Sequence, residues 1–194
     1  AAIAPWNNPF GIMTSKLAPA LVAGCCVIMK PAPETPIEAY ILAEAAEKAG
    51  IPEGVINLLP AHREASDYLA RHRGVDKVSF TGSVGAGARI ASVCGERIAR
   101  CTLELGGKSA AIVLPDYDIE AAAQAIGQTI TMSAGQICAT LSRAIVPRSQ
   151  QQRFVAAVAE TMKAIRVGDP FDPATQMGPV AMKRQLERVN GYID

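Results

Sequence analysis

The chain has 194 residues, of which 49% are hydrophobic and 19% are charged, and its formal net charge is +1. This balance predicts a globular core and excludes a disordered chain, and the near-neutral charge without Lys/Arg runs argues against nucleic acid or an anionic membrane as a partner. No stretch of about 18 unbroken apolar residues occurs, so no membrane span is expected, and no signal-peptide pattern precedes the first elements.

Strands and helices alternate along the first half of the chain. A strand at the very start and a buried strand over residues 27–29 come first. Thr35 is expected to cap the next helix, with Pro36 in its first turn and Glu38 completing a capping box, and Gly50 is expected to end it. The elements that follow are strands over residues 55–59, 75–80 and 98–105, a helix over residues 64–71, and a helix that ends near residue 93. This alternation predicts a parallel sheet with crossover helices, in the order of a dinucleotide fold.

The pattern changes after Gly107, and we place a domain boundary near Gly106. The elements expected beyond it are strands over residues 110–114 and 143–146, helices over residues 119–134 and 150–165, a turn-rich loop over residues 168–173, and an amphipathic helix close to residue 194. The chain begins without Met inside a strand and stops just after a helix, so we expect it to be a piece of a longer protein.

Four short motifs carry the chemistry of the chain. They are Pro5-Trp6-Asn7-Asn8-Pro9, Phe80-Thr81-Gly82-Ser83, Glu104-Leu105-Gly106-Gly107-Lys108 and Gly135-Gln136-Ile137-Cys138. A thiol and a carboxylate provide a nucleophile and a general base, which suffice for two-step acyl chemistry through a thioester. The glycines let the backbone approach a ligand where a Cβ would clash.

In this order the motifs resemble the NAD(P)-dependent aldehyde dehydrogenase superfamily. The resemblance implies an α/β fold in which residues 1–106 are part of a Rossmann-like dinucleotide-binding domain and residues 107–194 are the start of an α/β catalytic domain with a thiol nucleophile. Family members are more than twice this long, so the chain is expected to be a central fragment. The family also implies NAD or NADP as cofactor, a small aldehyde as substrate, and a dimer or tetramer of the full-length protein. Reduced cysteines fit a cytoplasmic location.

The resemblance assigns the reacting groups to three residues. Cys138 attacks the aldehyde carbonyl, and the side-chain amide of Asn7 donates to the resulting oxyanion together with the backbone N–H of Cys138. Glu104 activates the water that cleaves the thioester. Because Glu104 falls among apolar residues, we expect it to be partly buried, which suits a base working near neutrality. Its presence favours release of a free acid over transfer of the acyl group to coenzyme A.

The cofactor contacts implied by the family include Lys30 at the adenosine ribose and Trp6 packing beside the cofactor. The full expected set is Trp6, Lys30, Phe80, Thr81, Gly82, Ser83, Gly87, Leu105 and Gly106. Many members have a carboxylate three residues after the lysine, whereas this chain has Pro33, which makes NADP permissible. The glycine pair that many members carry after the next strand is replaced by the segment at residues 60–63, so the cofactor contacts of that loop differ. By resemblance the substrate tunnel includes Asn8, Ile12, Ile137 and Ala139.

A nucleotide-hydrolysing loop, a zinc site and a disulfide framework are weaker interpretations of the glycines and cysteines. The glycine spacing after Thr81 resembles the start of a Walker A loop, but Ala88 and Arg89 stand where Lys and Ser/Thr are required. The cysteines form no Cys-x-x-Cys pair and the histidines are not near them in sequence, so neither zinc nor a disulfide framework is expected. Ordinary packing is the expectation for four of the five cysteines, namely Cys25, Cys26, Cys94 and Cys101.

Two alternative functions remain open on the sequence alone. A cofactor-free cysteine hydrolase needs a histidine within reach of the thiol, and both histidines, His62 and His72, belong to the cofactor half. A catalytically inactive fragment of the same fold is the more serious alternative. A later Glu-x-Phe-Gly-Pro segment that the family uses at the nicotinamide ribose is absent from the 194 residues.

Overall fold

The computed structural model describes residues 1–193, and the chain forms two compact units that divide between Gly106 and Gly107. The elements of the first unit are β1 (Ala2–Ile3), α1 (Pro9–Val22), β2 (Val27–Lys30), α2 (Ile37–Lys48), β3 (Ile56–Leu58), α3 (Arg63–Arg71), β4 (Lys77–Thr81), α4 (Val84–Glu96) and β5 (Arg100–Glu104). Those of the second unit are β6 (Ala110–Ile112), α5 (Ile119–Thr131), the 3-10 helix η1 (Met132–Gly135), β7 (Arg143–Ile145), the 3-10 helix η2 (Arg148–Gln150), α6 (Gln151–Lys163) and α7 (Lys183–Ile193).

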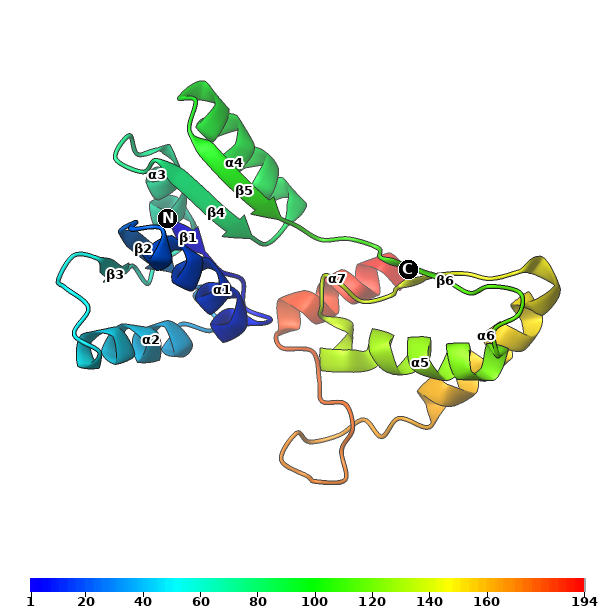
Figure 1. The fold of residues 1–194 in the computed structure, drawn as a ribbon. Coiled ribbons are helices and arrows are strands. Elements are labelled where there is room, and N and C mark those ends of the chain that lie inside the picture. Colours follow the sequence, from blue (N-terminus) through cyan, green and yellow to red (C-terminus); the bar gives the residue numbers. More distant parts are fainter. Residues whose placement is uncertain (194) are drawn as a thin grey trace. The chain divides into compact units, whose positions relative to one another are not determined.

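The first unit is built on one parallel sheet with the strand order β3-β2-β1-β4-β5 (Figure 1). The chain fills the sheet outward from β1 to β3 and then returns to the other side of β1 with β4. This reversal of direction is the mark of a doubly wound sheet, which binds ligands at the point where the order reverses. The predicted α/β fold with a parallel sheet and crossover helices is confirmed.

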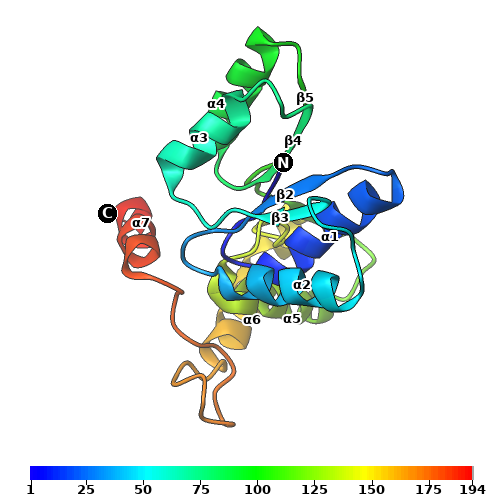
Figure 2. The same cartoon turned by 90° about the vertical axis from the view of Figure 1, so that its left-hand side faces the viewer.

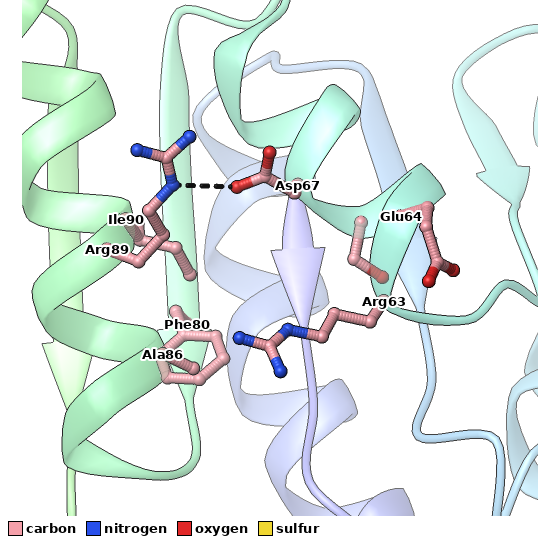
Figure 3. A pocket seen from close by; sticks show the side chains of 8 residues that line it. Arg63, Glu64, Asp67, Phe80, Ala86, Arg89 and Ile90 are labelled. Atoms are coloured by element: carbon pink, nitrogen blue, oxygen red, sulfur yellow. Dashed lines mark hydrogen bonds and ion pairs between the residues drawn. The ribbon is translucent and has the colours of Figure 1, made fainter.

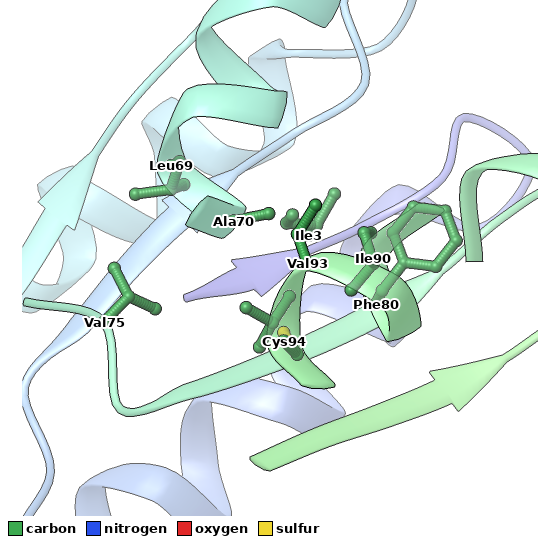
Figure 4. Close-up of a cluster of buried hydrophobic side chains, with 9 residues drawn as sticks. Ile3, Leu69, Ala70, Val75, Phe80, Ile90, Val93 and Cys94 are labelled. Carbon is green, nitrogen blue, oxygen red and sulfur yellow. The ribbon is translucent and has the colours of Figure 1, made fainter. Parts of the chain in front are cut away.

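Helices cover both faces of this sheet, with α1 and α2 on one side and α3 and α4 on the other (Figure 2). Side chains alternate between the faces along a strand, so Ala2 and Ala4 of the first strand segment pack towards α1 while Ile3 packs towards α3 and α4. The second face holds a cluster of nine buried side chains, which includes Val78 and Cys94 (Figure 4). Burial on both faces explains why β1 and the first three residues of β2 are apolar without a polar alternation.

The second unit has a small parallel sheet and a pair of packed helices. β6 and β7 pair with Ala110 opposite Arg143, and a separate core forms between α5 and α6 around Ile119 and Phe154. Asp118 caps α5, because its carboxylate accepts a hydrogen bond of 2.8 Å from the backbone N–H of Ala121. This cap satisfies one of the free N–H groups at the start of the helix.

Helix α1 has no counterpart among the predicted elements. Pro9 occupies its first turn, where a residue without an N–H is tolerated, but the two prolines around Asn7 and Asn8 are also typical of a turn. Pro19 lies inside the helix near its end, and proline in a helical segment argues against a helix in any sequence pattern. Tertiary packing of Met13 and Leu17 against the sheet overrides that local preference.

The capping box predicted for Thr35 and Glu38 is wrong. The residue before α2 is Pro36, no side chain caps the helix, and Oγ1 of Thr35 is buried without a hydrogen-bond partner among residues 1–193. The N–H of Thr35 donates to Ala32 at 3.2 Å, so Thr35 belongs to the preceding turn and cannot face the first N–H groups of the helix. Gly50 does end α2, with a φ of 72° that suits glycine.

Candidate active site

The predicted functional residues of the first unit gather at the carboxyl edge of its sheet. Trp6 and Asn7 follow β1, Lys30 ends β2, and Glu104 ends β5. Because the strands are parallel, their carboxyl ends meet at the same edge, which is where open α/β sheets bind ligands. Trp6 and Asn7 are half-buried in the loop that leads from β1 into α1.

The ends of β4 and β5 are joined directly. Thr81 lies opposite Glu104 in the ladder, and the N–H of Gly82 donates to the carbonyl oxygen of Glu104 at 3.0 Å. A Cβ on Gly82 would lie 2.5 Å from Cζ of Phe80, so a side chain at this position would displace the ring. The structure therefore brings Phe80, Thr81, Gly82 and Glu104 together at the ends of β4 and β5.

The carboxylate of Glu104 is exposed, so the predicted partial burial is wrong for the first unit taken by itself. The physical reason is that β5 is the edge strand of the five-stranded sheet and has a neighbour on one side only. The flanking Leu103 and Leu105 are half-buried, which accounts for the apolar character of the sequence around Glu104. Its role as a general base stays a prediction.

The turn after β4 leads into the start of α4, where the N–H groups of the first residues have no carbonyl partner within the helix. The hydroxyl of Ser83 accepts a hydrogen bond of 3.3 Å from the N–H of Ala86 and caps the helix. Gly87 is buried against Leu105, and a Cβ on Gly87 would lie 2.5 Å from Cδ2 of that leucine. Gly106 is exposed at the end of the segment that carries Glu104. A helix N-terminus in this position favours a phosphate group.

Lys30 is a buried cation at the end of β2, with only 6% of its surface exposed. Burial lowers the pKa of its ammonium group, and the carboxylate of Glu34 opposes this effect. Pro33, which replaces the carboxylate of many family members, is exposed. A buried charge of this kind is costly to keep unless a ligand or partner uses it.

Lys16 is a further residue of this edge that the sequence interpretation missed. It lies on α1, its Nζ donates to Oγ of Ser79 at 3.0 Å, and burial lowers its pKa while the nearby Glu104 carboxylate raises it. Lys16 shares a helix face with the buried Met13 and Leu17. A lysine on an apolar helix face is a detectable signal, but it can be recognised only once α1 itself is known.

A cavity of about 470 Å³ lies between α3 and α4 over β4 (Figure 3). Phe80, Ala86 and Ile90 form its apolar wall, and charged residues from α3 and α4 surround it. The complete lining is Arg63, Glu64, Ser66, Asp67, Phe80, Ala86, Arg89 and Ile90. The cavity lies beside the first turns of both helices, on the same edge of the sheet as the predicted cofactor residues.

An ion pair connects the two helices across this cavity. Oδ1 of Asp67 accepts a hydrogen bond of 3.0 Å from Nε of Arg89, and its other oxygen lies 2.7 Å from a guanidinium nitrogen of Arg71. The hydrogen bond with Arg89, assisted by the neighbouring arginines, lowers the pKa of the Asp67 carboxyl. The side chain of Arg63 instead extends across the cavity towards Phe80 and Ala86 (Figure 3). Sequence patterns do not reveal this group, because α3 and α4 meet only in the folded chain.

Cys138 is exposed in the second unit, in a loop between η1 and β7. Gln136 anchors this loop, since its Nε2 donates to the carbonyl of Ser133 at 2.9 Å and its Oε1 accepts from the N–H of Ala181 at 3.0 Å. The hydroxyl of the buried Thr140 donates to the carbonyl of Ile137 at 3.1 Å on the other side of the thiol. The thiol is therefore accessible on a segment that is fixed at both ends. Its approach to Asn7 and Glu104 stays a prediction.

The chain reaches Cys138 through a left-handed turn that replaces the predicted end of α5. The helix was expected to continue to residue 134, but it ends at Thr131 and η1 follows. Ser133, Ala134 and Gly135 all have positive φ, at 51°, 55° and 72°. For a residue other than glycine this conformation costs about 1 kcal/mol, and such strain is typical of functional segments.

The remaining cysteines and the histidines form no metal site within the described residues. Cys94 is buried and Cys25, Cys26 and Cys101 are exposed. Within residues 1–193 no cluster of His, Cys, Asp and Glu is arranged to bind a metal ion. None of the described helices has the length and apolar character needed to cross a membrane. Both histidines belong to the first unit, so the unit that carries Cys138 contains no histidine to act as its base.

Comparison with known proteins places this geometry in a family. The model of the aldehyde dehydrogenase family matches residues 1–194. The geranial dehydrogenase of Castellaniella defragrans is 45% identical over 193 residues, which cover 100% of this chain and 40% of that protein. The betaine aldehyde dehydrogenase of Brucella ovis is 42% identical over 191 residues, which cover 98% of this chain and 39% of that protein.

Solved structures agree in fold. An aldehyde dehydrogenase of Mycobacterium tuberculosis, complexed with NAD+, superposes with a TM-score of 0.95 at 44% identity, covering 99% of this chain and 40% of that one. The C291A mutant of aldehyde dehydrogenase C from Pseudomonas syringae, in complex with NAD+ and octanal, gives a TM-score of 0.95 at 38% identity with the same coverage of both chains. The chain thus spans about 40% of the length of the relatives it matches. With a family model that matches from its first residue to its last and the same fold in solved members, the chain belongs to the aldehyde dehydrogenase family.

Proposed function

We propose that the protein oxidises an aldehyde to a carboxylic acid with NAD+ or NADP+. Aldehyde, NAD(P)+ and water are converted to the acid, NAD(P)H and a proton. The observation that carries the proposal is the match of the aldehyde dehydrogenase model over residues 1–194, since it includes all four motifs in their order. The exposed thiol in a fixed loop supports it from the structure.

Cys138 is the proposed nucleophile. Its sulfur attacks the aldehyde carbon and forms a thiohemiacetal, and loss of a hydride from that carbon leaves a thioester on Cys138. The negative charge that develops on the oxygen needs preorganised donors, for which we propose the amide of Asn7 and the backbone N–H of Cys138. One such donor stabilises a transition state by about 3 kcal/mol.

Glu104 is the proposed base for the second half of the reaction. It takes a proton from the water that attacks the thioester, so that the acid leaves and the thiol is restored. The ammonium of Lys16 interacts with this carboxylate, and it is held in place through its hydrogen bond to Ser79. We propose that Lys16, which Ser79 holds in place, helps to position the Glu104 carboxylate.

The first unit fits a nicotinamide dinucleotide. Gly82 and Gly87 leave no room for a Cβ, the first turn of α4 offers free N–H groups to a pyrophosphate, and Lys30 presents a buried cation at the carboxyl end of β2. The cavity between α3 and α4 has one apolar wall for a flat heterocycle and arginines around it for phosphate. When bound, the cofactor supplies the hydride acceptor.

The two halves of the reaction can be separated by substitution in the full-length protein. We expect Cys138→Ala to abolish NADH formation altogether, because no thiohemiacetal forms. We expect Glu104→Gln to release about one equivalent of NADH per site in a rapid burst and then to slow by about 100-fold or more, because only hydrolysis needs the base. Stopped-flow absorbance of NADH at saturating aldehyde measures both phases.

Cys26→Ala is the matched control, since Cys26 is another exposed thiol of the same chain. It is expected to behave as the unsubstituted protein does. A normal burst in Cys138→Ala would show that another residue is the nucleophile. Loss of the burst in a folded Glu104→Gln protein would assign Glu104 to the first half of the reaction.

A further inference from the structure

Two further thiols, both in the first unit, lie where α4 turns back into β5. Cys94 stands near the end of α4 and is 1% exposed, and Cys101 is the second residue of β5 and is exposed. The turn between them is tight, because the carbonyl of Cys94 accepts a hydrogen bond of 2.9 Å from the N–H of Ala99. Ile98 in this turn has a φ of 56°, which a branched residue rarely adopts.

Strand register shows that both thiols belong to the same face of the sheet. Cys101 lies directly opposite Val78 in the parallel ladder of β4 and β5, and paired residues of neighbouring strands point to the same side. Val78 is buried in the cluster that also contains Cys94 (Figure 4). Cys101 therefore points to the face that α4 covers, and it remains accessible because β5 is the edge strand.

The two thiols interact within a small polar group. Burial raises the pKa of the Cys94 thiol, and the Cys101 thiol raises it further through charge and a hydrogen bond, while Arg97 acts in the opposite direction. The guanidinium of Arg97 is held by the carbonyls of Val75 and Ala70, at 2.7 and 3.1 Å. The core therefore holds Cys94 in place, and two carbonyls hold the neighbouring Arg97.

We propose that Cys94 and Cys101 form a reversible disulfide when the protein meets a peroxide. The exposed Cys101 reacts first: its sulfur takes the terminal oxygen of hydrogen peroxide, which gives a sulfenic acid and releases water. The sulfur of Cys94 then attacks the sulfur of Cys101 and displaces a second water. Two thiols are oxidised to one disulfide and one peroxide is reduced to two waters.

The buried position of Cys94 sets its role. A thiol with a raised pKa is a poor nucleophile towards free oxidant, but it is well placed to resolve a sulfenic acid that forms in contact with it. The disulfide would tie the end of α4 to β5, the strand that ends at Glu104. Cys25 and Cys26 are both exposed but adjacent in sequence, so they serve as internal controls for unselective oxidation.

Peptide mapping of the native full-length protein tests the proposal. The protein is treated with a small excess of hydrogen peroxide, its remaining thiols are blocked with N-ethylmaleimide, and it is digested with trypsin without a reductant. Cleavage after Arg89, Arg97, Arg100 and Lys108 places the two cysteines in separate peptides, Ile90–Arg97 and Cys101–Lys108. Mass spectrometry is expected to find these two peptides linked, with two hydrogens fewer than their sum, and dithiothreitol is expected to separate them.

Two variants and a denatured control sharpen the outcome. In Cys94→Ala the link is expected to vanish and Cys101 is expected to be trapped by dimedone as its sulfenic acid, whereas Cys101→Ser is expected to leave Cys94 reduced. Oxidation in denaturant is expected to give mixed pairings. A disulfide requires the two Cα atoms to lie within about 7 Å of each other, so selective pairing in the native protein depends on the fold. The proposal is overturned if both cysteines are recovered alkylated after peroxide treatment, or if the native link is no more frequent than in the denatured protein.

Discussion

Two cations at the carboxyl edge of the first sheet, Lys30 and Arg63, differ in how far the fold removes them from water. Lys30 is buried and its pKa is lowered, whereas Arg63 extends into a cavity that other charges border. Removing a buried ammonium group from water destabilises the folded chain. A cation in an open cavity carries little of this penalty, so the two substitutions below have different consequences.

Replacing Lys30 by Met is expected to stabilise the fold and to weaken the binding of the cofactor. The free energy of unfolding should rise by about 1 kcal/mol at neutral pH, because an apolar side chain of similar length has no desolvation penalty, while the KM for the cofactor increases. The pKa of Lys30 is lowered in the fold. As the pH rises towards the ordinary lysine value of 10.5, Lys30 therefore loses its proton in the folded chain first, and the unfolded chain then binds more protons than the folded chain does. The unsubstituted protein therefore gains stability with pH, and the advantage of Lys30→Met shrinks.

Urea unfolding at neutral pH and at about pH 9.5 measures this convergence. Lys48→Met is the matched control, since Lys48 is exposed in the last turn of α2. It should change the urea midpoint little at either pH. A constant gap between Lys30→Met and the unsubstituted protein across this range would contradict the proposed origin of the effect.

Arg63 is expected to favour NADP+ over NAD+. A 2′-phosphate adds negative charge at the adenosine end of the cofactor, and of the two arginines that line the cavity, Arg89 is already paired with Asp67. Arg63→Ala should raise the KM for NADP+ about tenfold, which corresponds to about 1.4 kcal/mol, and that for NAD+ less. Initial rates with each cofactor measure the difference. Arg71→Ala, which removes the other partner of Asp67 outside the cavity lining, should leave the ratio of the two KM values unchanged.

Among the elements, helix α4 depends on a close contact with the segment after β5. Gly87 faces Leu105, whose Cδ2 would lie 2.5 Å from a Cβ at this position, whereas a Cβ at Gly85 meets nothing within 4 Å. Both glycines lie in the first turns of α4. They form a natural pair of test and control.

Gly87→Ala is expected to destabilise the protein by about 1 kcal/mol, because Leu105 must leave its place to admit the methyl group. Gly85→Ala should stabilise it by about 0.5 kcal/mol through helix propensity. Because Leu105 follows Glu104, we also expect Gly87→Ala to slow thioester hydrolysis more than the NADH burst. Thermal unfolding and the burst assay check the two parts, and equal stabilisation by both alanines would exclude the close contact.

At the scale of the whole molecule, the chain consists of two units and spans about 40% of the relatives it matches. Large apolar side chains remain exposed on both units, including Val22, Ile98 and Phe171. The assignment of the two units as cofactor and catalytic domains stays a proposal, as do the dimer or tetramer and the cytoplasmic location.

The 194-residue chain by itself is expected to react with iodoacetamide at Cys138 but to produce no steady-state NADH from aldehyde and NAD+. The thiol is accessible without further residues, whereas the predicted nicotinamide contact of the family lies outside the chain. Peptide mapping identifies the alkylated cysteine, and absorbance at the NADH band measures turnover. Several turnovers per chain would show that the 194 residues hold a complete active site.

The sequence by itself determined the class of fold, the order of the strands and of the helices other than α1, and the four motifs of the family. These features are local, because periodicity, glycine spacing and short motifs are written in neighbouring residues. Only the tertiary structure decided that α1 forms around Pro9 and Pro19, that Glu104 lies exposed on an edge strand, that Lys16 meets Ser79, and that Asp67 meets Arg89. Each of these depends on contacts between elements far apart in the chain. There, packing outweighs local preference, and the spacing of residues along the sequence does not indicate which residues will be in contact.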